Sequence, residues 1–422
     1  MVDTADDTHR SVLSRLRRGA AVVFAGSALG YGITYLLTPI LGRLVSPDAF
    51  GAFAAVLAVA SLLTGFSTLR LEIFAASSES EEDQHNALQL AIATALIISI
   101  SVSVLAFTIF FIANIPPIWL LVGPMVLMGS LQLIAIARGS IERRYPAMGI
   151  GNLIQGGGTG LGQLGFALAS PTAAALAFGF LIARVHWVIA IVRLGTSTVS
   201  VRSTWERSRS FARTAGLGAL LNSAGGQAPV LLISLTFGAA GAGLFAIAVR
   251  LLIGPLAIIA QAVGSTSIGE VGRLASNRDP RLPATLASLS RQLLIMGAAP
   301  CLAAFIMGPW LISILLGPAW ADTGDIIRAL SVGALAQFVG APVTQTLNLM
   351  HRSRTLMYWE IARLLTFVAI FLILPSLDYD IIATCWAYSV ALCIMYAFVW
   401  VLILNAARSH STGRNANSSP MK

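Results

Sequence analysis

The sequence has little charge. Asp, Glu, Lys and Arg together make up 11% of its 422 residues, whereas 56% of the residues are hydrophobic. A soluble domain carries about 25% charged residues, because its surface must face water. This composition excludes a soluble globular protein and indicates a chain that lies in a lipid bilayer.

Cysteine is also scarce. The three cysteines, Cys301, Cys385 and Cys393, lie in apolar segments, and the five histidines are scattered along the chain. This pattern contains no disulfide framework and no metal-binding spacing. No nucleophile–base pair or phosphate-binding loop is recognisable, since the glycine-rich run GGGTG at 156–160 lies inside an apolar segment, where small residues serve close helix packing. We therefore expect a protein that is not an enzyme and binds no metal or cofactor.

Apolar segments of about 20 residues, the length that crosses the hydrocarbon core as a helix, recur along the whole chain. The twelve segments lie at 19–41, 50–70, 88–112, 118–137, 148–169, 172–192, 214–236, 241–263, 290–316, 326–348, 356–374 and 381–405. The first is preceded by a polar decapeptide and lacks a small-residue cleavage site, so it does not resemble a cleaved signal peptide. The sequence predicts an all-α polytopic membrane protein.

The basic residues predict the orientation of this bundle. With the N-terminus inside, the inner connections contain most of the arginines, while the outer connections contain only Arg43. This asymmetry is the positive-inside pattern, with both termini cytoplasmic. It accounts for most of the net charge of +9, so we expect contact with anionic lipids and no nucleic acid.

Two stretches of the chain are similar at an offset of 192 residues. SPDAFGAFAAVLAV at 46–59 aligns with GAAGAGLFAIAVRL at 238–251, so that Gly51 corresponds to Gly243. Each stretch opens an even-numbered segment, as expected for two six-helix lobes related by an axis along the membrane normal. The predicted organisation is an N-terminal tail at 1–18, a first lobe at 19–194, a basic inter-lobe linker at 195–213, a second lobe at 214–405 and a C-terminal tail at 406–422.

Arg250 lies within the apolar run of the eighth segment, where a buried charge is costly. At 100° per residue it shares one helix face with small and polar residues, among them Gly254 and Gln261, opposite a face of large apolar residues. We favour a water-filled cavity on this side, because glycines beside a guanidinium leave space. The alternative is an arginine that is packed against another helix.

Other segments contain polar residues with similar alternatives. Asn152, Gln155, Thr159 and Gln163 form one stripe on the fifth segment, which suits a cavity or interhelical hydrogen bonds. For Arg184 in the sixth segment, cavity and packing are equally favoured. The seventh segment contains Asn222 and Gln227 near a helix break expected at Pro229. On the first segment, Gly26, Gly30 and Thr34 favour simple helix packing.

The remaining charges lie near segment ends. Arg18, Arg70 and Arg138 would form a basic inner rim that collects anionic headgroups. Asp325 with Arg328, and Glu360 with Arg363, have the spacing of local ion pairs. No acidic residue occupies the centre of a segment, although a proton or sodium relay usually needs one. A cationic cavity suits an anion such as phosphate, which guanidinium groups bind bidentately.

Four stretches resemble a known family. They are LGRLVSPDAFGAF at 41–53, STLRLEIFAASSESEEDQHNALQLA at 67–91, AGAGLFAIAVRLLIGPL at 240–256 and LLGPAWADTGDIIRAL at 315–330. They are similar to the polysaccharide (O-antigen type, Wzx-like) flippases of the multidrug/oligosaccharidyl-lipid/polysaccharide (MOP) exporter superfamily, and more distantly to the lipid II flippase.

The resemblance implies a multi-pass flippase of the bacterial inner membrane that carries polyprenyl-pyrophosphate-linked oligosaccharide by rocking of its two lobes. Its partners would be the lipid-linked glycan, membrane lipids and glycan assembly proteins. Arg250 matches an arginine that is thought to engage pyrophosphate in the lipid II branch. The alternatives are a cation-coupled multidrug or other small-molecule exporter, a membrane glycan polymerase or ligase, and a scaffold protein. The short outer connections disfavour the enzyme.

Overall fold

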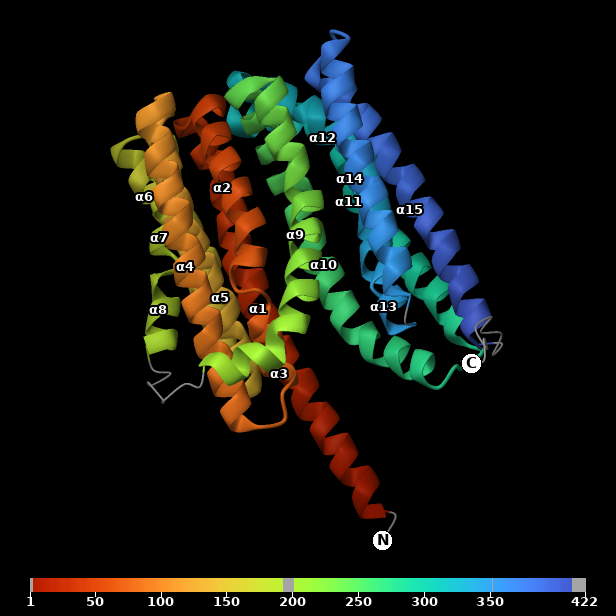
Figure 1. The fold of residues 1–422 in the computed structure, drawn as a ribbon. Helices are drawn as coiled ribbons and strands as arrows, with labels where there is room; N and C mark the ends of the chain where they lie inside the picture. The colour runs from red at the N-terminus through yellow and green to blue at the C-terminus, as the bar shows by residue number, and fades with distance from the viewer. Residues whose placement is uncertain (1–2, 193–200, 351, 412–422) are drawn as a thin grey trace, which may run out of the picture. The chain divides into compact units, whose positions relative to one another are not determined.

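The computed structural model describes residues 3–192, 201–350 and 352–411, with side chains over 19–192, 203–260, 263, 270–350 and 352–410. In these ranges the chain is helical and contains no β-strand. It divides into two compact units, residues 1–246 (unit 1) and 247–422 (unit 2), whose boundary lies inside helix α10 (Figure 1).

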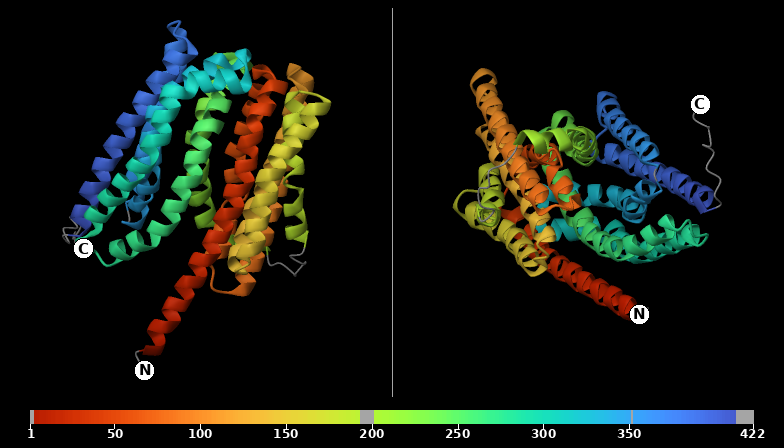
Figure 2. Two further views of the ribbon diagram at one scale, coloured as in Figure 1. Left: turned by 180° about the vertical axis from the view of Figure 1, so that it is seen from behind. Right: turned by 60° about the horizontal axis from the view of Figure 1, so that its bottom comes forward.

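Unit 1 consists of helices that pack side by side. They are α1 (Asp3–Leu44), α2 (Pro47–Ser67), α3 (Leu71–Ser77), α4 (Glu81–Ala113), the short 3₁₀-helix η1 (Pro117–Leu121), α5 (Val122–Ile141), α6 (Tyr145–Ala169), α7 (Ala173–Ile182), α8 (Val185–Val192), α9 (Val201–Thr236) and the first residues of α10 (Gly238–Ser276). The long helices α1 and α6 lie against each other (Figure 2).

Unit 2 contains the remainder of α10 and a second group of long helices. They are α11 (Leu282–Leu316), the 3₁₀-helix η2 (Pro318–Trp320), α12 (Ala321–Thr344), α13 (Thr346–Leu349), α14 (Ser353–Ser376) and α15 (Ile381–Ser411). The predicted boundaries of the two lobes and the linker stay a prediction. Residues 201–213, expected in the linker, are already helical in α9.

The expected all-α membrane fold is confirmed. Each of the twelve predicted segments falls on a described helix or helix pair, and eleven helical spans within the described residues are long and apolar enough to cross a membrane. The remaining segment is α6, whose sequence contains the predicted polar stripe and many glycines. The protein is therefore a multi-pass membrane protein.

Helix ends follow local sequence signals. Ser46 caps α2, where its side chain accepts a hydrogen bond from the backbone N–H of Ala49, and Pro47 occupies the first turn. Ser80 caps α4 in the same way, and three acidic residues follow it where the positive end of the helix dipole favours them. These caps begin the helices close to the predicted segment starts.

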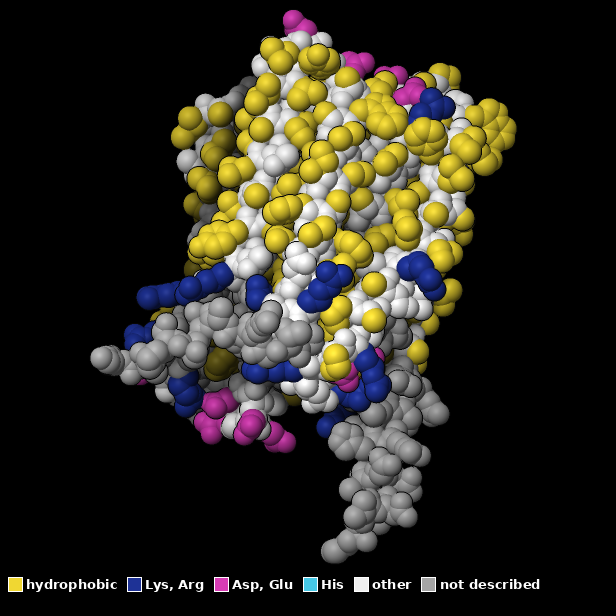
Figure 3. All heavy atoms as spheres, turned by 90° about the vertical axis from the view of Figure 1, so that its right-hand side faces the viewer, with side chains coloured by type: hydrophobic (Ala, Val, Ile, Leu, Met, Phe, Trp, Pro, Cys, Tyr) yellow, Lys and Arg dark blue, Asp and Glu magenta, His cyan; other side chains and the backbone are white. Residues whose placement is uncertain are grey.

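The surface of unit 2 is suited to lipid. Leu302, Ile306 and Trp310 on α11 are exposed, as are Ile394 and Phe398 on α15. Figure 3 shows one face of the molecule on which hydrophobic side chains cover a broad band and most of the visible Lys and Arg side chains gather toward one end. Such a band is expected for helices that face hydrocarbon. The predicted orientation of the termini stays a prediction.

Candidate functional site

Glycines on α1 and α6 bring these two helices into backbone contact. A Cβ atom added at Gly26 would overlap the backbone of Gly149, and one added at Gly156 would lie 2.5 Å from the carbonyl carbon of Gly30. Thr34 donates a hydrogen bond across this contact to the carbonyl oxygen of Gly156. The packing role predicted for Gly26, Gly30 and Thr34 is confirmed.

The polar stripe of α6 lies within this packed region. Asn152 Nδ2 donates to Ser27 Oγ on α1 at 2.9 Å. Gln155 bridges two helices, since its Nε2 donates to Tyr31 Oη at 3.2 Å while its Oε1 accepts from Trp187 Nε1 at 2.6 Å. The same amide therefore links α6 to α1 and to α8.

Thr159 and Gln163, nearer the C-terminal end of α6, also make hydrogen bonds. Gln163 Nε2 donates to the carbonyl oxygen of Leu176 on α7 at 3.3 Å, and Thr159 Oγ1 donates to that of Gln155 at 2.7 Å. Gln155 and Gln163 are each 1% exposed. The structure thus shows interhelical hydrogen bonding, which the sequence left open as the alternative to a cavity. Contact of these residues with a substrate stays a prediction.

Arg184 lies where the sixth predicted segment is interrupted between α7 and α8. Its backbone N–H donates to Leu181 O at 3.0 Å instead of continuing the α-helical pattern to Phe180 O. The guanidinium supplies the missing donor, because Arg184 Nη1 donates to Phe180 O at 3.0 Å. The expected single helix over 172–192 is therefore divided, and a side chain satisfies the carbonyl that the break releases.

The surroundings of Arg184 are mostly apolar. Its guanidinium carbon lies 3.4 Å from the centroid of the Phe180 ring, and Nη1 is 3.5 Å from Thr159 Oγ1. The side chain is 8% exposed, and its Nε atom is buried without a hydrogen-bond partner. No carboxylate among the described residues forms an ion pair with it. This is a buried cation whose charge is offset only by a carbonyl, a hydroxyl and an aromatic ring.

Arg250 lies on α10 in unit 2 and is partly buried. On the opposite face of this helix, Leu252 and Leu256 are buried in the protein, whereas Gly254 is partly exposed and Ala257 is exposed. Close to Arg250 the small-residue face of α10 is therefore the more open one, whereas farther along the helix Ile259 of the large apolar face is exposed. The side chain of Gln261 lies outside the described residues.

The predicted residues of α9 lie on a continuous helix. The helix break expected at Pro229 is wrong, because α9 runs from Val201 to Thr236 with this proline inside it. A helix tolerates proline when neighbouring groups or water satisfy the freed carbonyl. Asn222 is exposed and Gln227 is partly exposed, so both side chains are accessible.

Of the residues predicted for the inner rim, Arg70 and Arg138 each form an ion pair. The side chain of Arg18 lies outside the described residues. Arg70 Nη1 lies 3.7 Å from Glu72 Oε1. Glu72 is 3% exposed, and both of its carboxylate oxygens are buried without a hydrogen-bond partner. Arg138 Nε donates to Glu142 Oε1 at 2.6 Å, and its Nη1 donates to Ala190 O at 2.6 Å.

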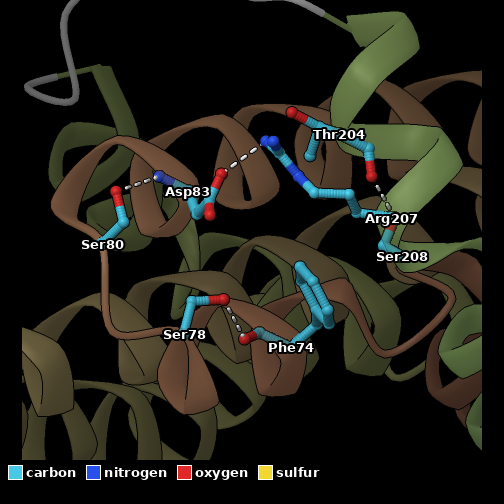
Figure 4. A network of polar contacts seen from close by, with 7 residues as sticks. All are labelled: Phe74, Ser78, Ser80, Asp83, Thr204, Arg207 and Ser208. Atoms are coloured by element: carbon cyan, nitrogen blue, oxygen red, sulfur yellow. Dashed lines mark hydrogen bonds and ion pairs between the residues drawn. The ribbon is translucent and has the colours of Figure 1, made fainter.

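A polar latch, the ion pair of Asp83 with Arg207, joins the first turn of α4 to the first turns of α9 (Figure 4). Arg207 Nη2 on α9 pairs with Asp83 Oδ1 on α4 at 2.5 Å. Beneath this pair the rings of Phe74 and Phe211 lie 5.8 Å apart. The charged stretch at 67–91 is thereby attached to the part of the expected linker that is helical in α9.

The two glycines that correspond in the internal repeat contact each other. A Cβ atom on Gly51 would overlap Ala239 O and lie 2.6 Å from the backbone nitrogen of Gly243, while one on Gly243 would overlap Pro47 O. Both glycines belong to unit 1.

In unit 2 an ion pair within α14 is connected to α15 by a hydrogen bond. Arg363 Nη2 donates to Glu360 Oε2 at 2.5 Å, and Nη1 donates to Tyr396 Oη at 3.1 Å. The guanidinium carbon also lies 4.8 Å from the centroid of the Trp359 ring. The predicted local pair is confirmed, as is that of Arg328 with Asp325 at 3.4 Å. The partial burial of Glu360 was not expected.

Of the acidic groups, Glu72 is buried and Glu360 is partly buried, and neither was expected to be. Glu270 lies beyond the apolar span of α10 and is exposed. The hydrogen bond from Arg273 lowers the pKa of its carboxyl, so this pair is ionised near neutral pH. No group of three or more His, Cys, Asp or Glu side chains in the described part of the chain is arranged to hold a metal ion.

Comparison with known families identifies the chain. The family described as polysaccharide biosynthesis protein matches residues 40–325. The chain belongs to this family. The match covers 41–53 and 67–91, two of the stretches that carry the resemblance, and the whole of α10. The resemblance to a Wzx-like flippase is therefore confirmed, and no curated protein sequence matches the chain.

Solved structures show which fold this member of the polysaccharide biosynthesis family has. An inward-facing multidrug resistance MATE transporter of the MOP superfamily has a TM-score of 0.70 at 13% identity, with 91% of this chain and 96% of that chain covered. The lipid II flippase MurJ in an inward closed conformation has a TM-score of 0.69 at 12% identity, covering 91% and 89%.

A third similar structure is a MOP superfamily transporter from Pyrococcus furiosus, whose binding pocket is described as having reversed polarity. Its TM-score is 0.63 at 13% identity, with 93% of this chain and 96% of that chain covered. These likenesses show the fold alone. The family member is thus a membrane protein with the MOP transporter fold.

Proposed function

We propose that this protein flips polyprenyl-pyrophosphate-linked oligosaccharide across the bacterial cytoplasmic membrane for surface polysaccharide biosynthesis. The observation that carries the proposal is the combination of the polysaccharide biosynthesis family with the MOP transporter fold, which the lipid II flippase shares. Alternating access of two six-helix lobes is the proposed mechanism, because an oligosaccharide cannot cross hydrocarbon without a hydrated path.

Arg250 is the proposed contact for the pyrophosphate. It lies on the more open side of α10, and a guanidinium binds phosphate oxygens through two parallel hydrogen bonds. Asn222 and Gln227 on α9 are accessible and suit sugar hydroxyls. Gln155 and Gln163 could contact a glycan only after their present hydrogen bonds open, so they are weaker candidates.

The test is transbilayer movement of a fluorescent polyprenyl-pyrophosphate glycan in proteoliposomes. Arg250→Ala should abolish movement, and Arg250→Lys should retain a part of it, because lysine keeps the charge but loses the bidentate geometry. Arg281→Ala is the matched control, since Arg281 is an exposed arginine of the same unit. Thermal unfolding of each variant separates a folding defect from a transport defect. Full movement in folded Arg250→Ala would contradict the proposal.

A cation-coupled multidrug exporter is the second candidate. Two observations favour it. The MATE transporter is as similar in fold as the lipid II flippase, and Glu72 is a buried carboxylate and Glu360 a partly buried one, of the kind that cation coupling uses. Ethidium efflux driven by a sodium or proton gradient distinguishes the candidates. Efflux without movement of the lipid-linked glycan would support the exporter and overturn the flippase.

A further inference from the structure

A cavity of about 310 Å³ lies within unit 1 between α5, α6 and α8. Its mouth is formed by Arg138, Glu142 and Arg144, and its wall includes Met148, Ile154 and Trp187. All of these residues belong to unit 1.

The charged mouth is built by the turn between α5 and α6. Arg143 has a positive φ of 55°, and Arg144 N–H donates to Gly139 O at 2.8 Å, which is the Schellman ending of a helix. This turn directs Glu142 toward both neighbouring arginines. Its Oε1 accepts from Arg138 at 2.6 Å, and its Oε2 lies 2.8 Å from Arg144 Nε.

The mouth retains a net positive charge, because two arginines share one carboxylate. The Arg144 side chain is 63% exposed and uses only Nε in its ion pair, so its terminal nitrogens are available to a ligand. α6 begins at Tyr145 without a side-chain cap, and its first N–H groups and helix dipole add to the attraction for an anion.

Apart from His186, the rest of the lining consists of small and apolar residues. Ile150 and Ile154, one turn apart on α6, are exposed large hydrophobic residues, and the ring of Trp187 closes the inner wall. A cationic mouth beside an apolar wall is complementary to an amphiphile with an anionic head. The volume lies at the lower end of the range for ligand pockets, about 300–1,000 Å³, and suits a single phosphate headgroup rather than an oligosaccharide.

We propose that this cavity binds an anionic phospholipid of the surrounding membrane. The phosphate would lie at Arg144, Arg138 and the start of α6, with one acyl chain along Ile150 and Ile154. In the predicted orientation the mouth faces the cytoplasmic leaflet, whose anionic lipids attract basic side chains. The bound lipid would hold α5 and α8 to α6, since Arg138 already joins α5 to the carbonyl of Ala190 on α8. The inference does not depend on the transported substrate.

The experiment measures binding of phosphatidylglycerol and phosphatidylcholine to the purified full-length protein by native mass spectrometry. The wild-type protein should retain phosphatidylglycerol in preference to phosphatidylcholine. Arg144→Gln should weaken this retention about tenfold, because a charge-assisted contact to phosphate is lost. Ile154→Trp, which fills the cavity from an exposed position, should have a similar effect.

Arg281→Gln is the matched control, because it removes an exposed arginine of unit 2 and should leave retention unchanged. Circular dichroism and thermal unfolding establish that each variant is folded. Equal retention of the two lipids by the wild-type protein, or unchanged retention in both Arg144→Gln and Ile154→Trp, would overturn the proposal. Displacement of the lipid by polyprenyl phosphate at equal concentration would also overturn it, since the site would then take the carrier lipid.

Discussion

Arg184 and Arg363 are both buried guanidinium groups in apolar helices, but their surroundings differ. Arg363 has a carboxylate, a tyrosine hydroxyl and a tryptophan ring around it. Arg184 has a backbone carbonyl, a threonine hydroxyl and a phenylalanine ring, with no acidic partner among the described residues. A buried charge is retained either because it is paired or because its charge is used.

Because their surroundings differ, we expect the two arginines to have different roles. Arg363 forms part of a neutralised network that connects α14 to α15, so its purpose is structural. Arg184, at a helix interruption, has no acidic partner among the described residues, and its contact with an anion during transport stays a prediction. Two helix contacts also differ, since α1 and α6 meet through glycines, whereas the α14–α15 contact uses the rings of Trp359, Phe367 and Tyr388.

The largest change in the free energy of unfolding should follow from breaking the ion pair of Glu360 with Arg363 in unit 2. Glu360→Gln would leave Arg363 buried without its counter-charge and should lower the free energy of unfolding by about 3–5 kcal/mol. Chemical or thermal denaturation in detergent measures this change. The double variant Glu360→Leu with Arg363→Met should recover most of the stability. If the single and double variants lose the same free energy of unfolding, the unpaired charge of Arg363 is not the cause of the loss.

The glycine contact of unit 1 should be nearly as sensitive. Gly156→Ala places a methyl group against the backbone of Gly30 and should cost about 1–3 kcal/mol, because the two helices must separate. Gly165→Ala on the same helix is the control, since nothing lies within 4 Å of its added Cβ atom. The same denaturation assay compares the two. A loss of equal size at Gly165 would refute the packing explanation.

Arg184→Met tests the comparison directly. The variant loses two hydrogen bonds but also removes a desolvated charge, so stability should change by only about 1 kcal/mol or less. Movement of the lipid-linked glycan in proteoliposomes should fall strongly. Arg363→Met should do the reverse and mainly destabilise the fold. If Arg184→Met transports normally, the uncompensated charge has no part in the mechanism.

The smallest effect is expected at the latch in Figure 4. Arg207→Gln removes an ion pair with Asp83 in which the arginine side chain is 53% exposed. Such exposed pairs contribute about 0.2–1 kcal/mol, and salt screens them. The stability difference from the wild-type protein should therefore shrink as sodium chloride is raised toward 1 M. A difference that is independent of salt would indicate that packing of Phe74 and Phe211 was disturbed instead.

The sequence by itself determined the helical membrane fold and much of the local structure. Segments such as 290–316 are long and apolar, and a chain in hydrocarbon must satisfy its backbone hydrogen bonds within a helix. The spacing of Gly26, Gly30 and Thr34 predicted a packing face, and Glu360 with Arg363 predicted an ion pair, because both patterns depend on neighbours along one helix. The family resemblance depended on motifs of the same local kind.

Only the tertiary structure decided which partner each polar group meets. Gln155 was predicted on the correct face of α6, but its bonds to Tyr31 and Trp187 depend on the register of α1 and α8 against that face. The interruption at Arg184, the burial of Glu72 and the cavity beside Arg144 likewise arise from several helices at once. Helical periodicity specifies the direction in which a side chain points, whereas its environment is set by segments that are distant in sequence.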